Sequence, residues 1–263
     1  MKTLIKTLPL AIGLFALAGC ATPQPPAPAS DFTASQQQAI AGIVAKTLIS
    51  NPSILVQAVQ ALKAQQTNTS NQQAMTAIIK NASNLINDEA SPFIGPANAP
   101  IVVIEFFDYQ CVYCHQVYPE MKALIAAHPN VKFIFKELPI FGATSVYAAK
   151  MSVVAFESNK FEAFHNALFD TGLMEGKLTP AAVDQVAQKV GINLKQAKVM
   201  MQGLSVSGEL SRNQYLAQEL AIGGTPDFVV MPNSVTPAIS KITFLPGAVP
   251  QQALEQAITQ AGS

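Results

Sequence analysis

Two cysteines separated by two residues, Cys111 and Cys114, are followed directly by His115 in the stretch CVYCH. A CxxC pair can exchange disulfide bonds with other thiols. In the form CxxCH it can also attach a c-type haem, whose vinyl groups bond both sulfurs while the histidine binds iron. A zinc site would need further ligands, and the sequence has no second CxxC and no HxxxH pair. The secondary structure predicted around the cysteines has to decide between disulfide exchange, haem attachment and zinc binding.

The run IVVIEFFDY, residues 101–109, ends just before the first cysteine and is rich in β-branched and aromatic residues. It predicts a buried strand near the centre of a sheet. Apolar residues at helical spacing follow within 115–128, and VKFIFKEL, residues 131–138, predicts a second strand. The cysteines therefore lie at the turn from strand into helix within a βαβ unit, which is the setting of a redox CxxC.

A helix N-terminus suits thiol chemistry because the attacking species is the thiolate. Unsatisfied backbone amides and the helix dipole stabilise that anion. Cys111 comes first, so we expect it to be the more exposed sulfur and the nucleophile. Cys114 lies one turn in, so we expect it to be buried and to resolve the mixed disulfide. Haem attachment does not call for an apolar strand at this point, which favours the redox interpretation.

Two longer stretches, FFDYQCVYCHQVYPEM and GGTPDFVV, resemble the DsbA-like thiol–disulfide oxidoreductases of the thioredoxin fold, over roughly residues 93–263. The resemblance implies that Thr225-Pro226 is a cis dipeptide that faces the CxxC and holds the substrate chain. It also places Glu105 as a carboxylate beneath the disulfide. Burial raises the pKa of a carboxyl group, so Glu105 is expected to relay the proton of Cys114.

Several alternatives remain open at these positions. Glu105 could instead be paired or lie at an exposed strand end, and Lys136 on the next strand is a possible partner. His115 could lie near the nucleophile and tune its thiolate, or be an ordinary helix residue. His128 and His165 are expected to be structural. The redox interpretation requires no organic cofactor and no metal.

The predicted fold is α/β, a thioredoxin-like fold with an inserted helical domain, preceded by an all-α N-terminal region. The insertion covers about residues 142–221 and contains five stretches with helical patterns: 144–157, 160–170, 179–190, 193–202 and 205–219. Strongly oxidising relatives often carry histidine inside the CxxC. Val112 and Tyr113 stand there in this sequence, so we expect a less oxidising pair that also reshuffles disulfides.

The first twenty residues have the layout of a secretory signal, with Lys2 and Lys6 before a short apolar run. The ending LAGC resembles the lipobox of bacterial lipoproteins. It implies a signal peptide at residues 1–19 and a lipid anchor on Cys20; an ordinary signal with a chance cysteine is the alternative. Ala21, rather than aspartate, follows that cysteine, which favours the outer membrane by analogy with lipoprotein sorting. We therefore expect a periplasmic protein, in a compartment where disulfides persist.

Residues 20–30 are rich in proline and predict a semi-rigid tether. Residues 31–91 form an N-terminal helical region, and residues 92–263 form the DsbA-like domain. The apolar stripes of the N-terminal helices are too narrow to close a core of their own. We expect them to join subunits into a homo-oligomer, or else to pack on the chain's second domain.

The charges balance at 16 basic and 16 acidic residues, which argues against a nucleic-acid partner. The expected function is a lipid-anchored, periplasmic thiol–disulfide oxidoreductase. It would form and reshuffle disulfides in exported proteins and be recycled by a membrane redox partner. The alternatives are a protein that is mainly an isomerase or reductase, a non-catalytic surface or copper-handling lipoprotein, and a c-type cytochrome.

Overall fold

The structure is a computed structural model that describes residues 32–263. The predicted signal peptide, the lipidation site at Cys20 and the proline-rich tether lie outside the described residues. The chain divides into two units, one that ends at Gln60 and one that spans Ala61–Ser263.

The first unit contains helix α1 (Ala34–Ser50) and the beginning of α2 (Ser53–Lys80). Thr33 starts α1 with a capping box: its hydroxyl accepts from the backbone N–H of Gln36, whose side chain accepts from the backbone N–H of Thr33. None of the side chains of α1 is buried. Within residues 32–263 no single helix is long and apolar enough to cross a membrane; α1 and α2 pass that test only when they are counted together across their bend.

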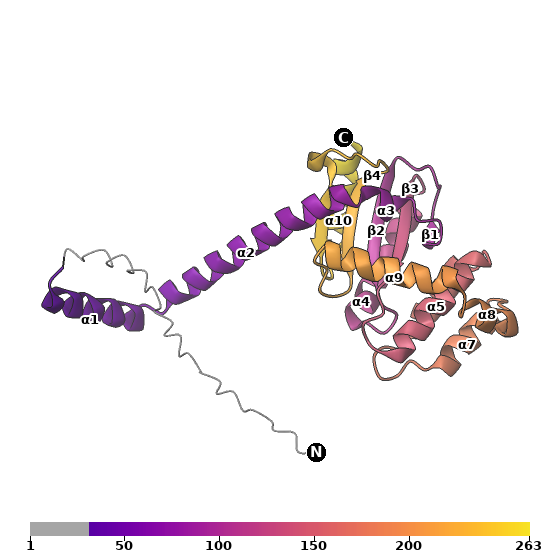
Figure 1. The fold of residues 1–263 in the computed structure, drawn as a ribbon, viewed down its shortest axis with the longest axis horizontal. Coiled ribbons are helices and arrows are strands. Elements are labelled where there is room, and N and C mark those ends of the chain that lie inside the picture. Colours follow the sequence, from indigo (N-terminus) through magenta and orange to yellow (C-terminus); the bar gives the residue numbers. More distant parts are fainter. Residues whose placement is uncertain (1–31) are drawn as a thin grey trace, which may run out of the picture. The chain divides into compact units, whose positions relative to one another are not determined.

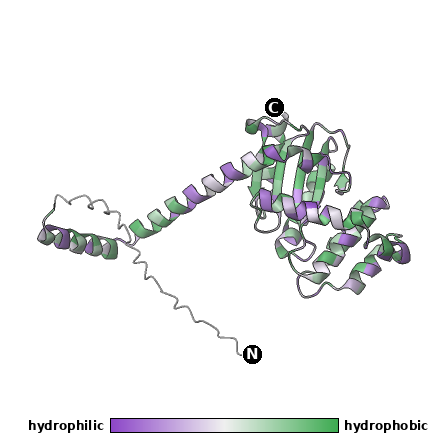
Figure 2. Ribbon diagram, in the orientation of Figure 1, coloured by the Kyte–Doolittle hydropathy of each residue, from purple (hydrophilic) through white to green (hydrophobic). Residues whose placement is uncertain are grey.

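The second unit is built on a five-stranded sheet in the order β1-β3-β2-β4-β5. Strand β2 lies at its centre, as predicted; it is parallel to β3 and antiparallel to β4. The two edge strands, β1 and β5, are antiparallel to their neighbours. The strands are strongly apolar (Figure 2) and span these residues: β1 Phe93–Ile94, β2 Ile101–Phe107, β3 Val131–Glu137, β4 Asp227–Pro232 and β5 Thr243–Pro246.

One face of the sheet packs against α4 (Val112–Ala127) and α10 (Gln251–Gly262), and the same core continues into the helical insertion. The insertion forms as predicted, since all five expected helices are present within residues 142–221. They are α5 Ala143–Glu157, α6 Phe161–Phe169, α7 Pro180–Lys189, α8 Leu194–Met200 and α9 Leu204–Glu219.

The opposite face is covered by α9, by α3 (Ala82–Ile86) and by the end of α2, as Figure 1 shows. Ile78 and Leu85 are fully buried in this second core. The last part of the predicted N-terminal helical region therefore belongs to the core of the thioredoxin-like unit. The remaining short element is a 3-10 turn at Ile239–Lys241.

Candidate active site

The loop that carries the cysteines is fixed by one buried carboxylate, Asp108. Its oxygens accept hydrogen bonds from the backbone N–H groups of Gln110 at 2.8 Å and Ile140 at 2.7 Å, and from the Ser145 hydroxyl at 2.7 Å. Its backbone carbonyl accepts from the N–H of Cys111 at 3.0 Å. Cys111 is therefore held as the N-cap of α4 with an extended backbone, where the first amides of the helix point at its sulfur.

The pKa values of the two thiols are shifted in opposite directions. The Cys114 side chain donates a hydrogen bond that outweighs the burial of Cys111. With further help from Thr225 and from the amides of Cys114 and Tyr113, it lowers the pKa of Cys111 from 9.0 to about 6. Burial, followed by that same hydrogen bond and by the charge of Glu105, raises the pKa of Cys114 well above its usual value. One sulfur is thus a thiolate at neutral pH and the other a thiol.

The two cysteines do not differ in exposure, and our expectation that Cys111 would be the more exposed is wrong: both are 1% exposed. The Thr225-Pro226 loop packs directly against Cys111 and covers it. What distinguishes the two sulfurs is the hydrogen bonding at the helix N-terminus. The exposed apolar side chains at this place are Val112 (44% exposed) and Tyr113 (56% exposed), which lie between the cysteines in sequence.

The Thr225-Pro226 peptide bond is cis, as the resemblance implied. In the thiol form, Cys111 Sγ donates to the carbonyl oxygen of Thr225 at 3.1 Å. The Thr225 hydroxyl is buried without a hydrogen-bond partner among the described residues. It can therefore donate to the sulfur once that sulfur is ionised, which agrees with its lowering effect on the Cys111 pKa.

Glu105 lies beneath the cysteines and is 5% exposed. Its register partners on both neighbouring strands are phenylalanines, Phe135 on β3 and Phe228 on β4. Burial, and then the negative charge of Cys111, raise its pKa from 4.5 to about 8. The carboxyl group therefore holds a proton near neutral pH and can exchange it with a neighbouring thiol.

Lys136 is not the partner of Glu105, and the structure corrects that hypothesis. Successive strand residues point to opposite faces of a sheet, and it is Phe135, one residue earlier, that pairs with Glu105. The fully buried Lys136 ammonium lies on the other face, 3.6 Å from an oxygen of Asp88 and 3.8 Å from one of Glu209.

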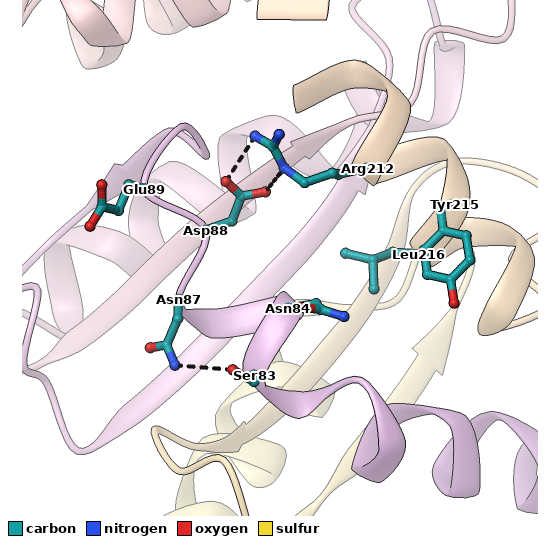
Figure 3. Close-up of a pocket in the computed structure, with 8 residues that line it drawn as sticks. All are labelled: Ser83, Asn84, Asn87, Asp88, Glu89, Arg212, Tyr215 and Leu216. Atoms are coloured by element: carbon teal, nitrogen blue, oxygen red, sulfur yellow. Dashed lines mark hydrogen bonds and ion pairs between the residues drawn. The ribbon is translucent and has the colours of Figure 1, made fainter. Parts of the chain in front are cut away.

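Arg212 completes this second charged cluster through a bidentate pair with Asp88, with N···O distances of 2.6 and 3.0 Å (Figure 3). Both residues line a pocket of about 440 Å³ on the α9 side of the sheet, together with Tyr215 and Leu216. The cluster joins the segment after α3 to α9 and to the sheet. We assign it to stability, because it lies on the face away from the thiols.

His115 does not bond the Cys111 sulfur. Its Nε2 atom lies 2.9 Å from the carbonyl oxygen of Tyr109, and its ring packs edge-on against Phe169. Burial lowers the pKa of His115 below its usual 6.5, so the ring is neutral at neutral pH. It therefore supplies no positive charge to the thiolate, contrary to the tuning hypothesis.

Sequence reasoning missed two functional groups of residues. One is Asp108, which fixes the active-site loop; a carboxylate directly between a buried strand and a CxxC was the available signal. The other is a line of buried polar residues beneath the cysteines: Tyr109, Glu137, Ser152 and His165. Of these, Glu137 could have been placed by alternation, since it lies two residues after Phe135 and faces the same side.

Replacing Glu105 with glutamine is expected to change the pH dependence of stability. Between pH 4.5 and about 8 the folded carboxyl keeps a proton that the unfolded chain has lost, so stability falls as the pH rises through this window. The free energy of unfolding of the variant, minus that of the wild type, should rise by on the order of 3 kcal/mol from about pH 4 to about pH 7. Urea unfolding of the reduced proteins measures it, with Glu162→Gln at an exposed site as matched control. An equal difference at both pH values would contradict the assignment.

Comparison with known proteins gives the family. Residues 102–259 match the DSBA-like thioredoxin domain, and the chain belongs to this family. The thiol pair described above, Cys111 and Cys114, lies within the matched residues. A separate match covers residues 36–67, to the N-terminal domain of the copper resistance protein ScsC.

Among solved structures, BcfH of Salmonella enterica Typhimurium is 33% identical, with a TM-score of 0.75 over 87% of this chain and 97% of that one. The thiol:disulfide interchange protein DsbA of Burkholderia cepacia is 28% identical over 51% of this chain and 66% of that protein. The Na⁺/H⁺ antiporter NhaA 3 of Salinispora tropica is 26% identical over 141 residues. The chain spans only 21% of that antiporter's length, within a region that covers 52% of this chain.

Proposed function

We propose that this protein is a periplasmic thiol–disulfide oxidoreductase that forms and reshuffles disulfide bonds in exported proteins with cysteines. The observation that carries the proposal is the opposed acidity of Cys111 and Cys114 at the start of α4. In this arrangement Cys111 is the reacting sulfur, Cys114 the resolving sulfur, and the Thr225-Pro226 loop the support for the substrate chain.

Disulfide donation proceeds in two exchanges. A substrate thiolate attacks the Cys111 sulfur of the oxidised pair, a mixed disulfide forms, and Cys114 leaves as a thiolate. That thiolate takes a proton from the Glu105 carboxyl group, which the charge balance of the buried site requires. A second substrate thiolate then attacks the substrate sulfur, and Cys111 leaves as a stabilised thiolate. Reduction follows the same steps in reverse.

The acidity of Cys111 supports a dual role. A lower pKa stabilises the reduced form and makes the disulfide a stronger oxidant. A pKa of about 6 lies between the about 7 of thioredoxin and the about 3.5 of DsbA. The reduced enzyme therefore keeps a reactive thiolate for reshuffling, while its disulfide still oxidises substrates and is restored by a membrane redox partner.

We further propose that the N-terminal helices join subunits, and that lipid on Cys20 anchors the assembly to a membrane, the outer membrane being favoured. Ile43 is 65% exposed, Leu55 52% and Leu62 54%. Leu55 and Leu62 are seven residues apart on α2, and Ile40, Ile43 and Val44 keep helical spacing on α1. Exposed apolar stripes of this kind are buried only when a partner covers them. A second copy of the same helices is a partner of matching chemistry.

Reactivation of scrambled ribonuclease in a thiol buffer tests the disulfide-reshuffling activity and its dependence on the oligomer. The chain without its signal is compared with a variant of it that carries Ile43→Asp and Leu55→Asp together. The wild type should form oligomers by light scattering and reactivate the substrate. The variant should have the mass of a monomer and lose most of this isomerase activity, while it still oxidises a single dithiol peptide.

The matched control carries Gln38→Asp and Gln57→Asp, which add the same charge at exposed polar positions of the same helices. It should behave as the wild type. An unchanged mass for the Ile43→Asp, Leu55→Asp variant would remove the oligomer from the proposal. No reactivation by a redox-active wild type would leave a dedicated oxidase or reductase.

Copper handling has less support as a function. The segment that matches the N-terminal domain of the copper resistance protein, residues 36–67, contains no Cys, His, Met, Asp or Glu. Within the described part of the chain there is also no group of three or more such acidic, histidine or cysteine side chains placed to hold a metal ion. Copper(I) would have to use the thiol pair itself.

A further inference from the structure

A continuous line of hydrogen bonds runs beneath the active site through four buried side chains. His165 Nδ1 lies 3.1 Å from the Tyr109 hydroxyl. That hydroxyl donates to Ser152 Oγ at 3.0 Å, and Ser152 Oγ donates to an oxygen of Glu137 at 2.6 Å. The four residues are at most 5% exposed, and neither the disulfide exchange nor the fold described above accounts for their polarity.

The hydrogen bonds all point the same way. Tyr109 has one proton, which it donates to Ser152, so its oxygen accepts from His165 Nδ1–H. This fixes the tautomer of the neutral imidazole: the proton is on Nδ1, and Nε2 is left with a lone pair. The line therefore begins at an acceptor on His165 and ends at the carboxyl group of Glu137.

The end of the line at His165 lies beside the thiol site. His165, Glu105 and Cys114 line one small cavity of about 10 Å³, which is close to the room that a single water molecule needs. The imidazole packs on Phe107 and Phe135, with ring centres 5.3 and 4.7 Å away.

Those two phenylalanines place the imidazole between two carboxyl groups. Phe135 is the register partner of Glu105, and Phe107 is the register partner of Glu137. The two glutamates therefore lie diagonally across adjacent strands on the same face of the sheet. The His165 ring, which packs on Phe107 and Phe135, therefore lies between the two glutamates.

We propose that His165 and Tyr109 are proton-relay residues, which connect Glu105 to Glu137 through Ser152 and one water molecule in the cavity. The inference rests on the proposed function. It adds how Glu105 loses its proton and so becomes the carboxylate that deprotonates Cys114. Before resolution, the proton of the Glu105 carboxyl group passes by the water to His165 Nε2. The Nδ1 proton passes to Tyr109, the Tyr109 proton to Ser152, and the Ser152 proton to the Glu137 carboxylate.

No electron moves in this step, and one carboxylate replaces another. The new Glu105 carboxylate then takes the proton of Cys114, whose thiolate attacks the Cys111 sulfur and expels the substrate thiolate. His165 and Tyr109 touch neither the substrate nor the reacting sulfurs, so they act on the rate of this proton movement and not on the attack itself.

The energies of the groups suit a relay. Burial raises the pKa of Glu137 to about 8, and that of Glu105 also lies at about 8, so the proton is held about equally well at both ends. Near pH 7 both carboxyl groups are mostly protonated, and the relay operates in the fraction of molecules, about a tenth, in which Glu137 is ionised. Burial lowers the pKa of His165 to about 3, and the ring does not trap the proton on the way. The other titratable groups that face the line are Cys114, Tyr118 and Lys122 of α4. The charges of Glu209 on α9 and Lys136 on β3 also act on Glu137, the first raising its pKa and the second lowering it.

The test follows the mixed disulfide that forms when the reduced full chain reacts with oxidised glutathione, by acid quench and mass spectrometry. His165→Phe and Tyr109→Phe remove the relay but keep an aromatic ring in the cluster. Both should slow the decay of the mixed disulfide by about tenfold at neutral pH. Above about pH 8, where Glu105 is already ionised, the defect should disappear.

Tyr118→Phe is the matched control, since Tyr118 lines the same cavity but bonds Asn166 and lies outside the relay. Its decay rate, and the alkylation rate of Cys111 in all variants, should equal those of the wild type. Unchanged decay, or a loss of rate that is equal at every pH, would overturn the relay. If His165→Phe does not fold, Tyr109→Phe, which lacks one oxygen, decides. A wild type that forms no mixed disulfide would overturn the proposed function itself.

Discussion

Replacing Cys111 with serine is expected to reduce disulfide exchange to the rate without enzyme. With a pKa of about 6, about nine tenths of the Cys111 thiol is ionised at pH 7, and a thiolate is the nucleophile in this exchange. A serine hydroxyl is not ionised there and forms no disulfide. Oxidation of a dithiol peptide and reactivation of scrambled ribonuclease should both fall to background, and a normal circular dichroism spectrum would show that the fold remains.

Two substitutions of Cys114 serve as controls for the role of each sulfur. Cys114→Ala and Cys114→Ser should both accumulate a mixed disulfide on Cys111, because no second sulfur can release it. They should differ in acidity. The hydrogen bond from Cys114 is the largest cause of the low Cys111 pKa, so alanine should raise that pKa clearly while serine, which still donates, should raise it less. Ultraviolet absorbance of the thiolate measures this, and equal values for both variants would contradict the assigned cause.

Local pattern was sufficient for the elements that carry the thiols. The apolar run before the CxxC did form the central strand β2, and the cysteines begin α4. The five helices of the insertion follow their predicted ranges to within about two residues. These elements are encoded by periodicity within a short window, which the amino-acid sequence displays directly. The cis dipeptide, in contrast, came from resemblance to a family.

Contacts between elements could not be predicted in the same way. Lys136 was a possible partner of Glu105 from its place on the next strand, but it lies on the other face. The register between β2 and β3 is set by long-range pairing, and an offset of one residue reverses every side chain. The partners that Lys136 does meet are far away in sequence, at Asp88 and Glu209. The exposure of Cys111 also depended on a distant segment, the Thr225 loop.

The buried relay shows the same limit. The four residues come from different segments, and only the packed fold brings them into one line: Tyr109 from the loop after β2, Glu137 from β3, Ser152 from α5 and His165 from α6. Taken singly, His165 among phenylalanines has the pattern of a core residue, and that is how the sequence suggested it should be interpreted. Its position, with Nδ1 bonded to the Tyr109 hydroxyl and the side chain lining the thiol cavity, is a property of the tertiary structure.

Replacing Lys136 with methionine is expected to cost about 3–5 kcal/mol of unfolding free energy, because it leaves the two carboxylates of Glu209 and Asp88 to share one cation, Arg212. The Lys136 ammonium is fully buried, as is the Glu209 carboxylate beside it. It also donates to Ser91 Oγ at 2.6 Å, which in turn donates to Glu209 at 2.7 Å. Thermal unfolding should shift down by roughly 10 °C in a domain of this size.

The double variant Lys136→Met, Glu209→Met separates the lost charge from the lost packing. Removing both charges of a buried pair leaves no unpaired ion, so most of the lost stability should return. Lys80→Met provides the matched control, since Lys80 bonds Glu219 at 2.8 Å but its side chain is 69% exposed, and solvent screens such a pair. Urea unfolding of the four proteins at neutral pH measures all of these effects. If the double variant is no more stable than Lys136→Met alone, Lys136 contributes by packing, and its charge does not hold α9 to the sheet.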